Sequence, residues 1–285
     1  KLACPPPIGG GGHANLILER SLPAGRLLGI DADPQALELS RQRLAVWGER
    51  VILVQSNFVH VTSLAQRWGF APADGILMDL GWSSLQMQDA ARGFSFQHDG
   101  PLDMRYDPTL AVSAADLVNA LGERELADLL WRYGEERRSR RIARAIVAHR
   151  PIHSTVELAT LVERTVGRTE QIHPATRTFQ ALRIAVNDEL AILERTLEQL
   201  PALLAAGGVL AIIAFHSLED RLVKQFLMRE ARDCICPPEA PACVCQHRRR
   251  LELRPRGAIM PTPAEVQANP RARSARLRVA RRLPE

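Results

Sequence analysis

Acidic residues end two of the short apolar runs in this 285-residue sequence. Asp79 closes the run that begins at Gly75, and Asp31 closes the run that begins at Arg26. Such runs, bounded by turn signals, are typical of buried strands in a parallel sheet. The ligand of an open parallel sheet sits beyond the carboxyl ends of its strands. We therefore expect Asp79 at the rim of a pocket whose floor is the loop 80–89.

A glycine-rich turn, Gly9–His13, points at the same pocket. Glycines let the backbone approach a ligand closely, and the amides of the helix that follows attract negative charge. The string Gly9-x-Gly11-x-x-Ala14 matches a dinucleotide-binding fingerprint. Asp31 lies 20 residues after Gly11, where an acid that binds ribose hydroxyls is expected. NAD and S-adenosylmethionine both carry an adenosine ribose, so Asp31 suits either cofactor.

Alternating strands and helices must position these residues. Periodicity predicts strands over 26–31, 51–55 and 75–80, and helices over 14–22, 34–47 and 62–69. This order predicts an α/β fold with a doubly wound sheet. Three prolines in Lys1–Ile8 remove ladder donors. We therefore expect the first strand to be missing or irregular, as in a fragment or a sequence disturbed at its start.

The middle of the chain changes character. Residues 112–169 have helical periodicity, with helices predicted over 114–121, 123–133, 137–148 and 156–166. A long helix over 177–204 and a strand over 209–215 then return to the sheet. We predict a sheet domain over 1–107 and 175–285, the latter with a basic C-terminal tail, interrupted by an all-helical domain over 108–174.

Composition and cysteine usage bound the class of protein. The sequence is 46% hydrophobic, but its longest apolar run, 209–215, is far shorter than the roughly 18 residues of a membrane span. No secretory signal is visible. The five cysteines are an odd number, which fits a reducing cytosol better than a disulfide scaffold. These features predict a cytoplasmic protein without a membrane partner.

Four of the cysteines form a compact set, Cys234-x-Cys236 and Cys243-x-Cys245. Four thiolates suit tetrahedral zinc. The Cys-x-Cys spacing is tighter than that of the usual zinc knuckle, so free thiols remain the alternative.

Positive charge is unevenly placed. The net charge is +5, yet the segment from His247 onward holds eleven Arg against three Glu, an excess of +8 that leaves −3 for the remainder. A basic segment on a mildly acidic body indicates a polyanionic partner such as nucleic acid, although a solvated tail is the plainer reading. Two groups of arginines carry this interpretation: Arg137, Arg138, Arg140, Arg141 and Arg144 on one predicted helix, and Arg271, Arg273, Arg276 and Arg278 near the end.

Several further motifs resemble one known family. They are Asp79-Leu-Gly-x-Ser-Ser84, Arg92–Phe96, Asp99–Arg105, Tyr133–Arg137, His173–Arg183, Phe215–Arg221 and Asn269–Ser274. In this order they resemble the bacterial 16S ribosomal RNA cytosine-N4 methyltransferases, the methyltransferase H or MraW family. The resemblance covers nearly the whole chain from Gly11. The sequence departs from the family pattern at its start and at Trp82.

The resemblance implies a class I, Rossmann-like S-adenosylmethionine-dependent methyltransferase sheet with an inserted helical domain. It implies methylation of a cytidine N4 in 16S ribosomal RNA of the small subunit, at the decoding region. The residues that would bind the cofactor are Gly11, Gly12, His13, Asp31, Phe58, Asp79 and Gln86. Phe58 would pack on the adenine, with core filling as its alternative. Arg177 and Arg183 join the predicted RNA contacts because they lie nearer the presumed crevice.

Methyl transfer to the N4 amine needs an acceptor for an amine proton and in-line placement of the reacting atoms. Asp79, or a carbonyl within 80–84, is expected to be that acceptor, although Asp79 ranks first as a cofactor ligand. His216 is a second catalytic candidate. Its alternative is structural, because Ser217-x-x-Asp220 reads as a capping box.

Two other functions remain open on sequence alone. One is a ribosome-assembly factor that binds RNA through a degenerate cofactor site, which the irregular start keeps in view. The other is an NAD-dependent oxidoreductase, against which the Asp-Leu-Gly-x-Ser-Ser loop argues. The oligomeric state is not indicated.

Overall fold

The computed structural model describes residues 2–4, 11–81, 86–87, 89–167, 173–240 and 242–284. The chain forms two compact units, one made of Lys1–Gly81 with Leu190–Glu285 and the other of Trp82–Glu189. The inserted unit is wider than the predicted 108–174 because residues on both sides of that range, such as Leu102 and Phe179, belong to its core. No helix within these described ranges is long and apolar enough to cross a membrane.

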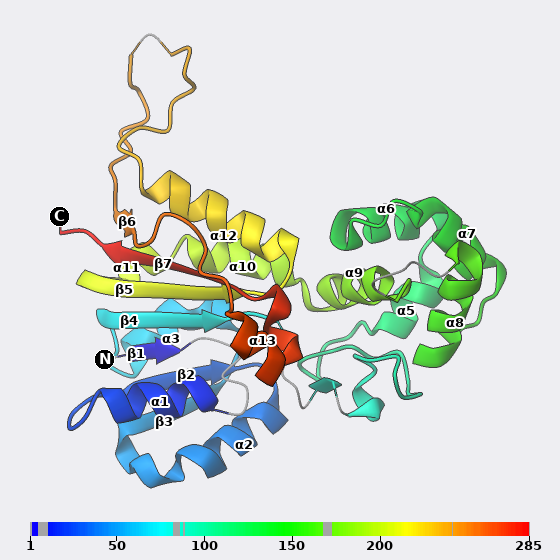
Figure 1. The fold of residues 1–285 in the computed structure, drawn as a ribbon, viewed down its shortest axis with the longest axis horizontal. Helices are drawn as coiled ribbons and strands as arrows, with labels where there is room; N and C mark the ends of the chain where they lie inside the picture. The colour runs from blue at the N-terminus through cyan, green and yellow to red at the C-terminus, as the bar shows by residue number, and fades with distance from the viewer. Residues whose placement is uncertain are drawn as a thin grey trace. The chain divides into compact units, whose positions relative to one another are not determined.

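The first unit is built on a seven-stranded sheet of order β3-β2-β1-β4-β5-β7-β6 (Figure 1). Its strands are β1 (Leu2–Cys4), β2 (Leu27–Asp31), β3 (Val51–Gln55), β4 (Ala73–Asp79), β5 (Leu204–Ala214), β6 (Leu251–Leu253) and β7 (Arg276–Arg282). Strands β1 to β5 pair in parallel, whereas β7 is antiparallel to both neighbours. The strand order reverses between β1 and β4, which is the point where doubly wound sheets bind ligands. The predicted Rossmann-like α/β class is confirmed.

The first strand is present. Leu2–Cys4 pairs in parallel with β2 on one side and β4 on the other. The expectation of a missing or irregular strand is therefore wrong for these three residues, because the prolines that motivated it follow the strand and do not interrupt it. Residues 5–10, which include Gly9, lie outside the described part of the chain.

Helices cover both faces of the sheet because successive apolar side chains of a strand point to opposite faces. In β4, Leu77 packs with Leu18 and Leu37 of helices α1 (Gly12–Arg20) and α2 (Pro34–Leu44). Its neighbours Ile76 and Met78 join the opposite core. That core also includes side chains of helices α3 (Val61–Arg67), α10 (Glu189–Leu197) and α12 (Ser217–Glu230). A strand buried on both faces must end in polar residues at the sheet edge, as β4 does at Asp79.

The arginine-rich end of the chain is a strand rather than a solvated tail. β7 lies between β5 and β6, and two of its arginines clamp one carboxylate of α12. Arg278 donates from Nε to Asp220 Oδ1 at 2.7 Å, and Arg276 donates from Nη1 to Oδ2 at 2.9 Å. Desolvation acts to raise the pKa of Asp220, but the hydrogen bonds from Arg278 and Arg276 outweigh it and hold that pKa below its usual range. These two arginines are therefore structural.

The predicted helix over 177–204 is broken. It consists of α9 (Thr176–Asn187), α10 and α11 (Leu200–Leu203). Asp188 ends α9 because its φ of 48° lies in the left-handed region. The next strand begins at Leu204, five residues earlier than predicted, and its pairing with β4 shifts register between Ala73 and Gly75. Gly207 and Gly208 accommodate this irregularity inside the strand and do not end a helix.

The second unit is helical, as predicted. Helices α5 (Ala114–Ala120), α6 (Glu123–Gly134), α7 (Ser139–Ala148), α8 (Thr155–Val166) and α9 surround one apolar core. Gly134 lets α6 approach α9 closely, because a Cβ on this glycine would lie 2.5 Å from the carbonyl oxygen of Arg177. The predicted ends of these helices are within one residue of those observed, except at α7, which begins two residues later than predicted.

Breaking the Asp220 clamp should destabilise the sheet unit. Replacement of Arg278 by Met would remove two hydrogen bonds from a carboxylate that is 7% exposed. We expect the free energy of unfolding to fall by about 3 kcal/mol, as when a buried ion pair loses one member. The matched control is Arg254→Met, whose pair with Glu252 lies at the surface and should contribute at most about 1 kcal/mol. Urea unfolding at pH 7 measures both.

The same clamp predicts a pH dependence. Because the folded-state pKa of Asp220 is lowered, its stabilisation is complete above the ordinary carboxyl value of about 3.9 and is lost as the pH falls through the folded-state value. The stability difference between wild type and Arg278→Met should therefore narrow below about pH 4. A difference that stays constant from pH 7 to pH 3 would contradict the clamp.

Candidate functional site

Helix α1 begins at a glycine that the conformation requires. Gly11 is the N-cap with φ 74° and ψ 14°, a left-handed geometry in which any other residue is strained. Its carbonyl accepts the Asn15 N–H at 2.9 Å and so starts the helix. The first amides of a helix have no intrahelical acceptor and form its positive end. Gly12 and His13, which follow, are therefore placed to bind an anionic group.

Asp31 lies at the carboxyl end of β2. It is 3% exposed, and its Oδ1 accepts the N–H of Asp33 at 2.9 Å. Asp33 is the N-cap of α2, and its side chain accepts the N–H of Gln35. Pro34 occupies the first turn of the helix. The cap of α2 is thus Asp33 and not Asp31. Asp31 holds the turn from strand to helix, directly at the sheet edge.

His13 and Asp79 pair across the switch point of the sheet. His13 Nδ1, at the start of α1, lies 3.2 Å from Asp79 Oδ2, at the end of β4. The hydrogen bond with Asp79 raises the pKa of His13, against the opposing effect of its partial burial. The other oxygen, Asp79 Oδ1, is shielded from solvent and has no hydrogen-bond partner among the described residues. The sequence placed both residues in the pocket but did not reveal that they pair.

The remaining predicted cofactor residues occupy different settings. Phe58 opens a short 3-10 helix, η2 (Phe58–His60), after β3. It is half-buried and packs against the sheet core, which fits the core-filling alternative, whereas its contact with an adenine stays a prediction. Gln86 is buried and belongs to the second unit. Residues 82–85 and 88, which are half of the predicted pocket floor 80–89, lie outside the described residues.

His216 has a structural role that the sequence assigned to its neighbour. The N-cap of α12 is His216, not Ser217, because His216 Nδ1 accepts the Glu219 N–H at 3.4 Å. An Nδ1 that accepts must carry the lone pair, which places the proton of the neutral ring on Nε2. Nε2 lies 3.3 Å from Glu219 Oε1 but not in hydrogen-bonding geometry. This arrangement favours capping over proton acceptance by His216.

Glu219 is the residue that the sequence reasoning overlooked. It is 3% exposed, and its Oε2 accepts the N–H of Phe215 at 3.0 Å. Together with its contact to His216, this bond fixes the turn at the carboxyl end of β5. The signal was present as an acid three residues after the cap, which is the capping-box spacing counted from His216 instead of Ser217.

The arginines of the second unit divide into exposed and buried members. Arg137, Arg138, Arg140, Arg141, Arg144 and Arg177 are exposed. Arg144 pairs with Glu123, Arg138 donates to the Val166 carbonyl, and Arg177 donates to the Glu135 carbonyl.

Of these six arginines, three have guanidinium groups without a hydrogen bond or ion pair to any described residue, namely Arg137, Arg140 and Arg141. Arg140 and Arg141 lie on α7 opposite its buried face, which includes Ile142 and Ile146. Arg137 lies in the turn before α7 and not on the helix as predicted.

Arg183 is not a surface residue. It is 3% exposed, and its Nε and Nη2 bond both oxygens of Glu189 at 2.7 and 2.9 Å. An arginine held in this way inside the second unit orders α9 and offers no surface for a phosphate. In the first unit, Arg271 and Arg273 are exposed on η4 (Pro270–Ser274), which follows α13 (Pro263–Ala268).

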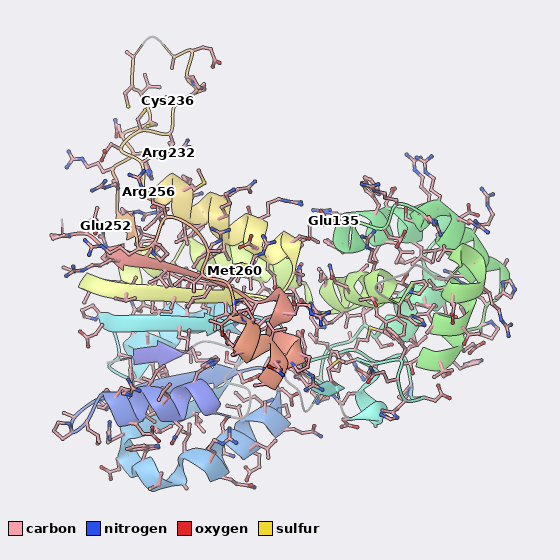
Figure 2. All side chains as sticks on the ribbon, in the orientation of Figure 1. Glu135, Arg232, Cys236, Glu252, Arg256 and Met260 are labelled. Atoms are coloured by element: carbon pink, nitrogen blue, oxygen red, sulfur yellow. The ribbon has the colours of Figure 1, made fainter. Side chains whose placement is uncertain are left out.

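The four late cysteines converge. They lie in the segment between α12 and β6, where Figure 2 shows Cys236 beyond Arg232 on a loop that extends from the sheet unit. Their sulfur atoms all lie within 4.8 Å of one another. The Ile235 and His247 N–H groups lower the pKa of Cys245 to about 6. The Cys236 N–H acts to lower the pKa of Cys234, but hydrogen bonds with the other thiols raise it to about 12.

Similarity to known proteins identifies the family to which the chain belongs. The chain is 52% identical over 279 residues to "Ribosomal RNA small subunit methyltransferase H" of Dehalococcoides mccartyi, covering 98% of this chain and 80% of that protein. It is 55% identical to the protein of that name from Thermomicrobium roseum, over 96% and 86% of the two chains. The Symbiobacterium thermophilum protein of that name is 51% identical over 97% and 89%. The sequence pattern of the MraW methylase family matches residues 5–283, and the chain belongs to this family.

Proposed function

We propose that this protein is an S-adenosylmethionine-dependent methyltransferase that modifies the N4 amine of a cytidine in the decoding region of small-subunit ribosomal RNA. The observation that carries the proposal is the His13–Asp79 pair, which joins the start of α1 to the end of β4 at the switch point of the sheet. Small-subunit ribosomal RNA is proposed as the substrate because the relatives' names state it. The cytidine N4 is proposed as the target atom because of the family resemblance. The cytoplasm, where ribosomal subunits are made, is the proposed place of action.

The residues present fit such a cofactor. S-adenosylmethionine supplies an electrophilic methyl group on a sulfonium, together with an adenosine ribose and a methionine carboxylate and ammonium. The positive end of α1 at Gly11, Gly12 and His13 suits the carboxylate. The orphaned Asp79 Oδ1 suits a hydrogen-bond donor such as the ammonium. We assign Asp31 to the ribose and Phe58 to the adenine, and Gln86 stays a predicted cofactor residue.

The burial of Asp31 places a condition on this assignment. At 3% exposed, its carboxylate meets a ribose only if cofactor binding opens the chain around the end of β2. Hydrogen bonds between this buried carboxylate and the ribose hydroxyls would form away from water, and the low local dielectric would strengthen them.

The proton acceptor in this proposal is Asp79 or a backbone carbonyl within 80–84, since Asp79 ranks first as a cofactor ligand. The N4 amine is a weak nucleophile because its lone pair is delocalised into the ring, and one amine proton must leave during or after transfer. The contact of Oδ2 with His13 fixes the Asp79 carboxylate in one orientation, so the amine proton and the cofactor would have to share Oδ1. His216 is assigned to positioning, because its Nδ1 is committed to the helix cap.

The test of the function is direct. Small-subunit RNA is incubated with the protein and methyl-labelled S-adenosylmethionine, digested, and mapped by mass spectrometry. One methyl group on a cytidine N4 of the decoding region is the expected outcome. Cofactor binding without methylation of any ribosomal RNA would favour the alternative of an assembly factor. Binding of NAD in place of S-adenosylmethionine would overturn the proposal.

Asp31→Asn should weaken S-adenosylmethionine binding by about 1.5–3 kcal/mol, the value of a hydrogen bond to a charged group. The matched control is Asp33→Asn, two residues away. It removes the same charge and keeps a good N-cap for α2. Isothermal calorimetry compares the two. Equal affinities for Asp31→Asn and wild type would remove Asp31 from the site.

Replacing Arg137, Arg140 and Arg141 by Ala should flatten the salt dependence of RNA affinity. Each lost phosphate contact lowers the log–log slope by about 0.7 to 0.9, so three contacts predict a decrease of about 2 to 3. Because phosphate contacts do not read bases, related RNAs should weaken about equally. The control replaces three exposed arginines of the sheet unit, Arg20, Arg41 and Arg67, which changes the net charge by the same amount.

RNA affinity at several salt concentrations measures this effect. Parallel slopes for wild type and the Arg137, Arg140 and Arg141 variant would show that these arginines are a solvated face. The phosphate contacts would then have to be sought at Arg271 and Arg273.

A further inference from the structure

The four late cysteines are arranged as a metal site. Three sulfur–sulfur distances are 3.5 Å for Cys234–Cys243, 3.6 Å for Cys243–Cys245 and 3.8 Å for Cys234–Cys245. A disulfide bond is about 2.0 Å long, so none of these pairs is bonded. Four ligands at a zinc–sulfur distance of about 2.3 Å in a tetrahedron are separated by about 3.8 Å. The three separations among Cys234, Cys243 and Cys245 lie within about 0.3 Å of that figure, and the Cys236 sulfur lies within 4.8 Å of the others.

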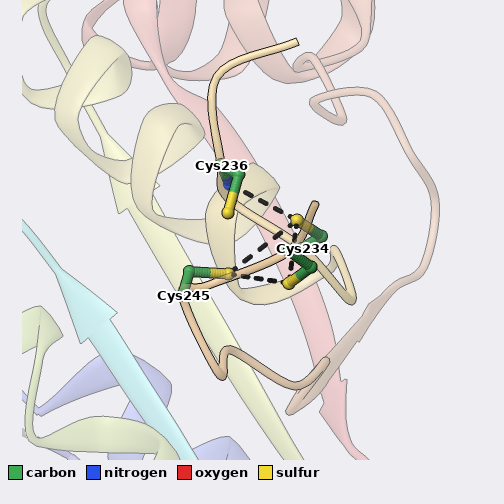
Figure 3. Close-up of side chains that lie close together, drawn as sticks. Cys234, Cys236 and Cys245 are labelled. Atoms are coloured by element: carbon green, nitrogen blue, oxygen red, sulfur yellow. Dashed lines mark hydrogen bonds between the residues drawn. The ribbon is translucent and has the colours of Figure 1, made fainter. Parts of the chain in front are cut away.

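The backbone around the sulfurs is equally specific. The Ile235 N–H donates to Cys245 Sγ, and the Val244 N–H donates to Cys236 Sγ, each at 3.4 Å. The middle residue of each Cys-x-Cys pair thus donates to the second cysteine of the other pair. Figure 3 shows the labelled sulfurs turned toward one another. Backbone donors of this kind stabilise negative sulfur and orient it, as outer hydrogen bonds do in metal sites.

The loop that carries the cysteines needs such a centre. Residues 231–250 join α12 to β6 without a helix or strand among the described residues. Loops longer than roughly 12–15 residues that lack secondary structure are uncommon in compact domains. The base of the loop is fastened. Arg250 donates to the buried Glu230 at 2.6 Å, and His247 Nε2 lies 3.0 Å from the Arg229 carbonyl oxygen. The cysteines lie beyond this base, and all four are exposed or half-buried, so apolar packing does not explain their convergence.

We propose that Cys234, Cys236, Cys243 and Cys245 bind one Zn²⁺ ion that holds this loop in its folded form. Four thiolates with no oxygen or nitrogen ligand select a soft, tetrahedral cation, and zinc needs no redox partner. Four protein ligands leave no open position, so the ion is structural and takes no part in methyl transfer. The site lies outside the pocket formed by His13 and Asp79 and is independent of the proposed function.

Metal analysis of the purified full-length protein tests the site. We expect about one zinc per chain in wild type and almost none in the Cys234→Ser, Cys236→Ser double variant. Cys4→Ser is the matched control, because Cys4 is the fifth cysteine and lies in β1, outside the loop. Replacement by Co²⁺ should give the intense visible absorption of a tetrahedral thiolate site. Iron in place of zinc, or zinc retained by the double variant, would overturn the assignment.

A measurement on wild type keeps the test independent of variant folding. Alkylation read by mass spectrometry should leave the four loop thiols unmodified before treatment with a strong chelator and modify all four afterwards. The rate of protease cleavage within 231–250 should also rise after chelation, because the zinc ion no longer holds the loop in its folded form. Four reactive thiols in metal-free, freshly purified protein would end the proposal.

Discussion

Two-sided burial of the central strands is the constraint on which the rest of the molecule depends. In β4, Leu77 faces one apolar core and Ile76 and Met78 face the other, so the strand has no solvent-exposed face. Polar groups of β4 lie only toward its two ends, at Asp74 and at Asp79, which meets His13 at the start of α1. The pocket chemistry follows from this packing. The carboxylate at that edge is held by the imidazole of His13.

Much of this arrangement could be read from residue types and spacing. The apolar runs that end in Asp31 and Asp79, the glycine before α1 and the helical periodicity of the second unit all predicted their elements. Local signals sufficed there because each element is defined by its own neighbours in the chain. The predicted boundaries of the inserted unit were too narrow, since the contribution of Phe94 and Phe179 to its core depends on packing between distant segments.

Long-range pairing is what the sequence could not supply. Arg276 and Arg278 look like a basic tail until β7 is placed beside β5, where Asp220 accepts from both. Arg183 looks like an RNA contact until Glu189 is seen to hold it. Asp188, which breaks the long helix, is an ordinary helix-end residue whose left-handed conformation only the folded chain reveals. Ser217 was predicted as the cap of α12 because serine is a common N-cap residue, whereas the observed cap, His216, is of an uncommon type.

The position of β7 has a consequence for synthesis. It is the last of the described strands in the chain, yet it lies between β5 and β6 inside the sheet. Until it emerges from the ribosome, β5 keeps an open edge and Asp220 lacks both partners. An uncovered edge in a nascent chain is a template for pairing with other chains. The sheet unit, already divided by the helical unit, can therefore close only after Arg276–Arg282 has been made and has entered between β5 and β6.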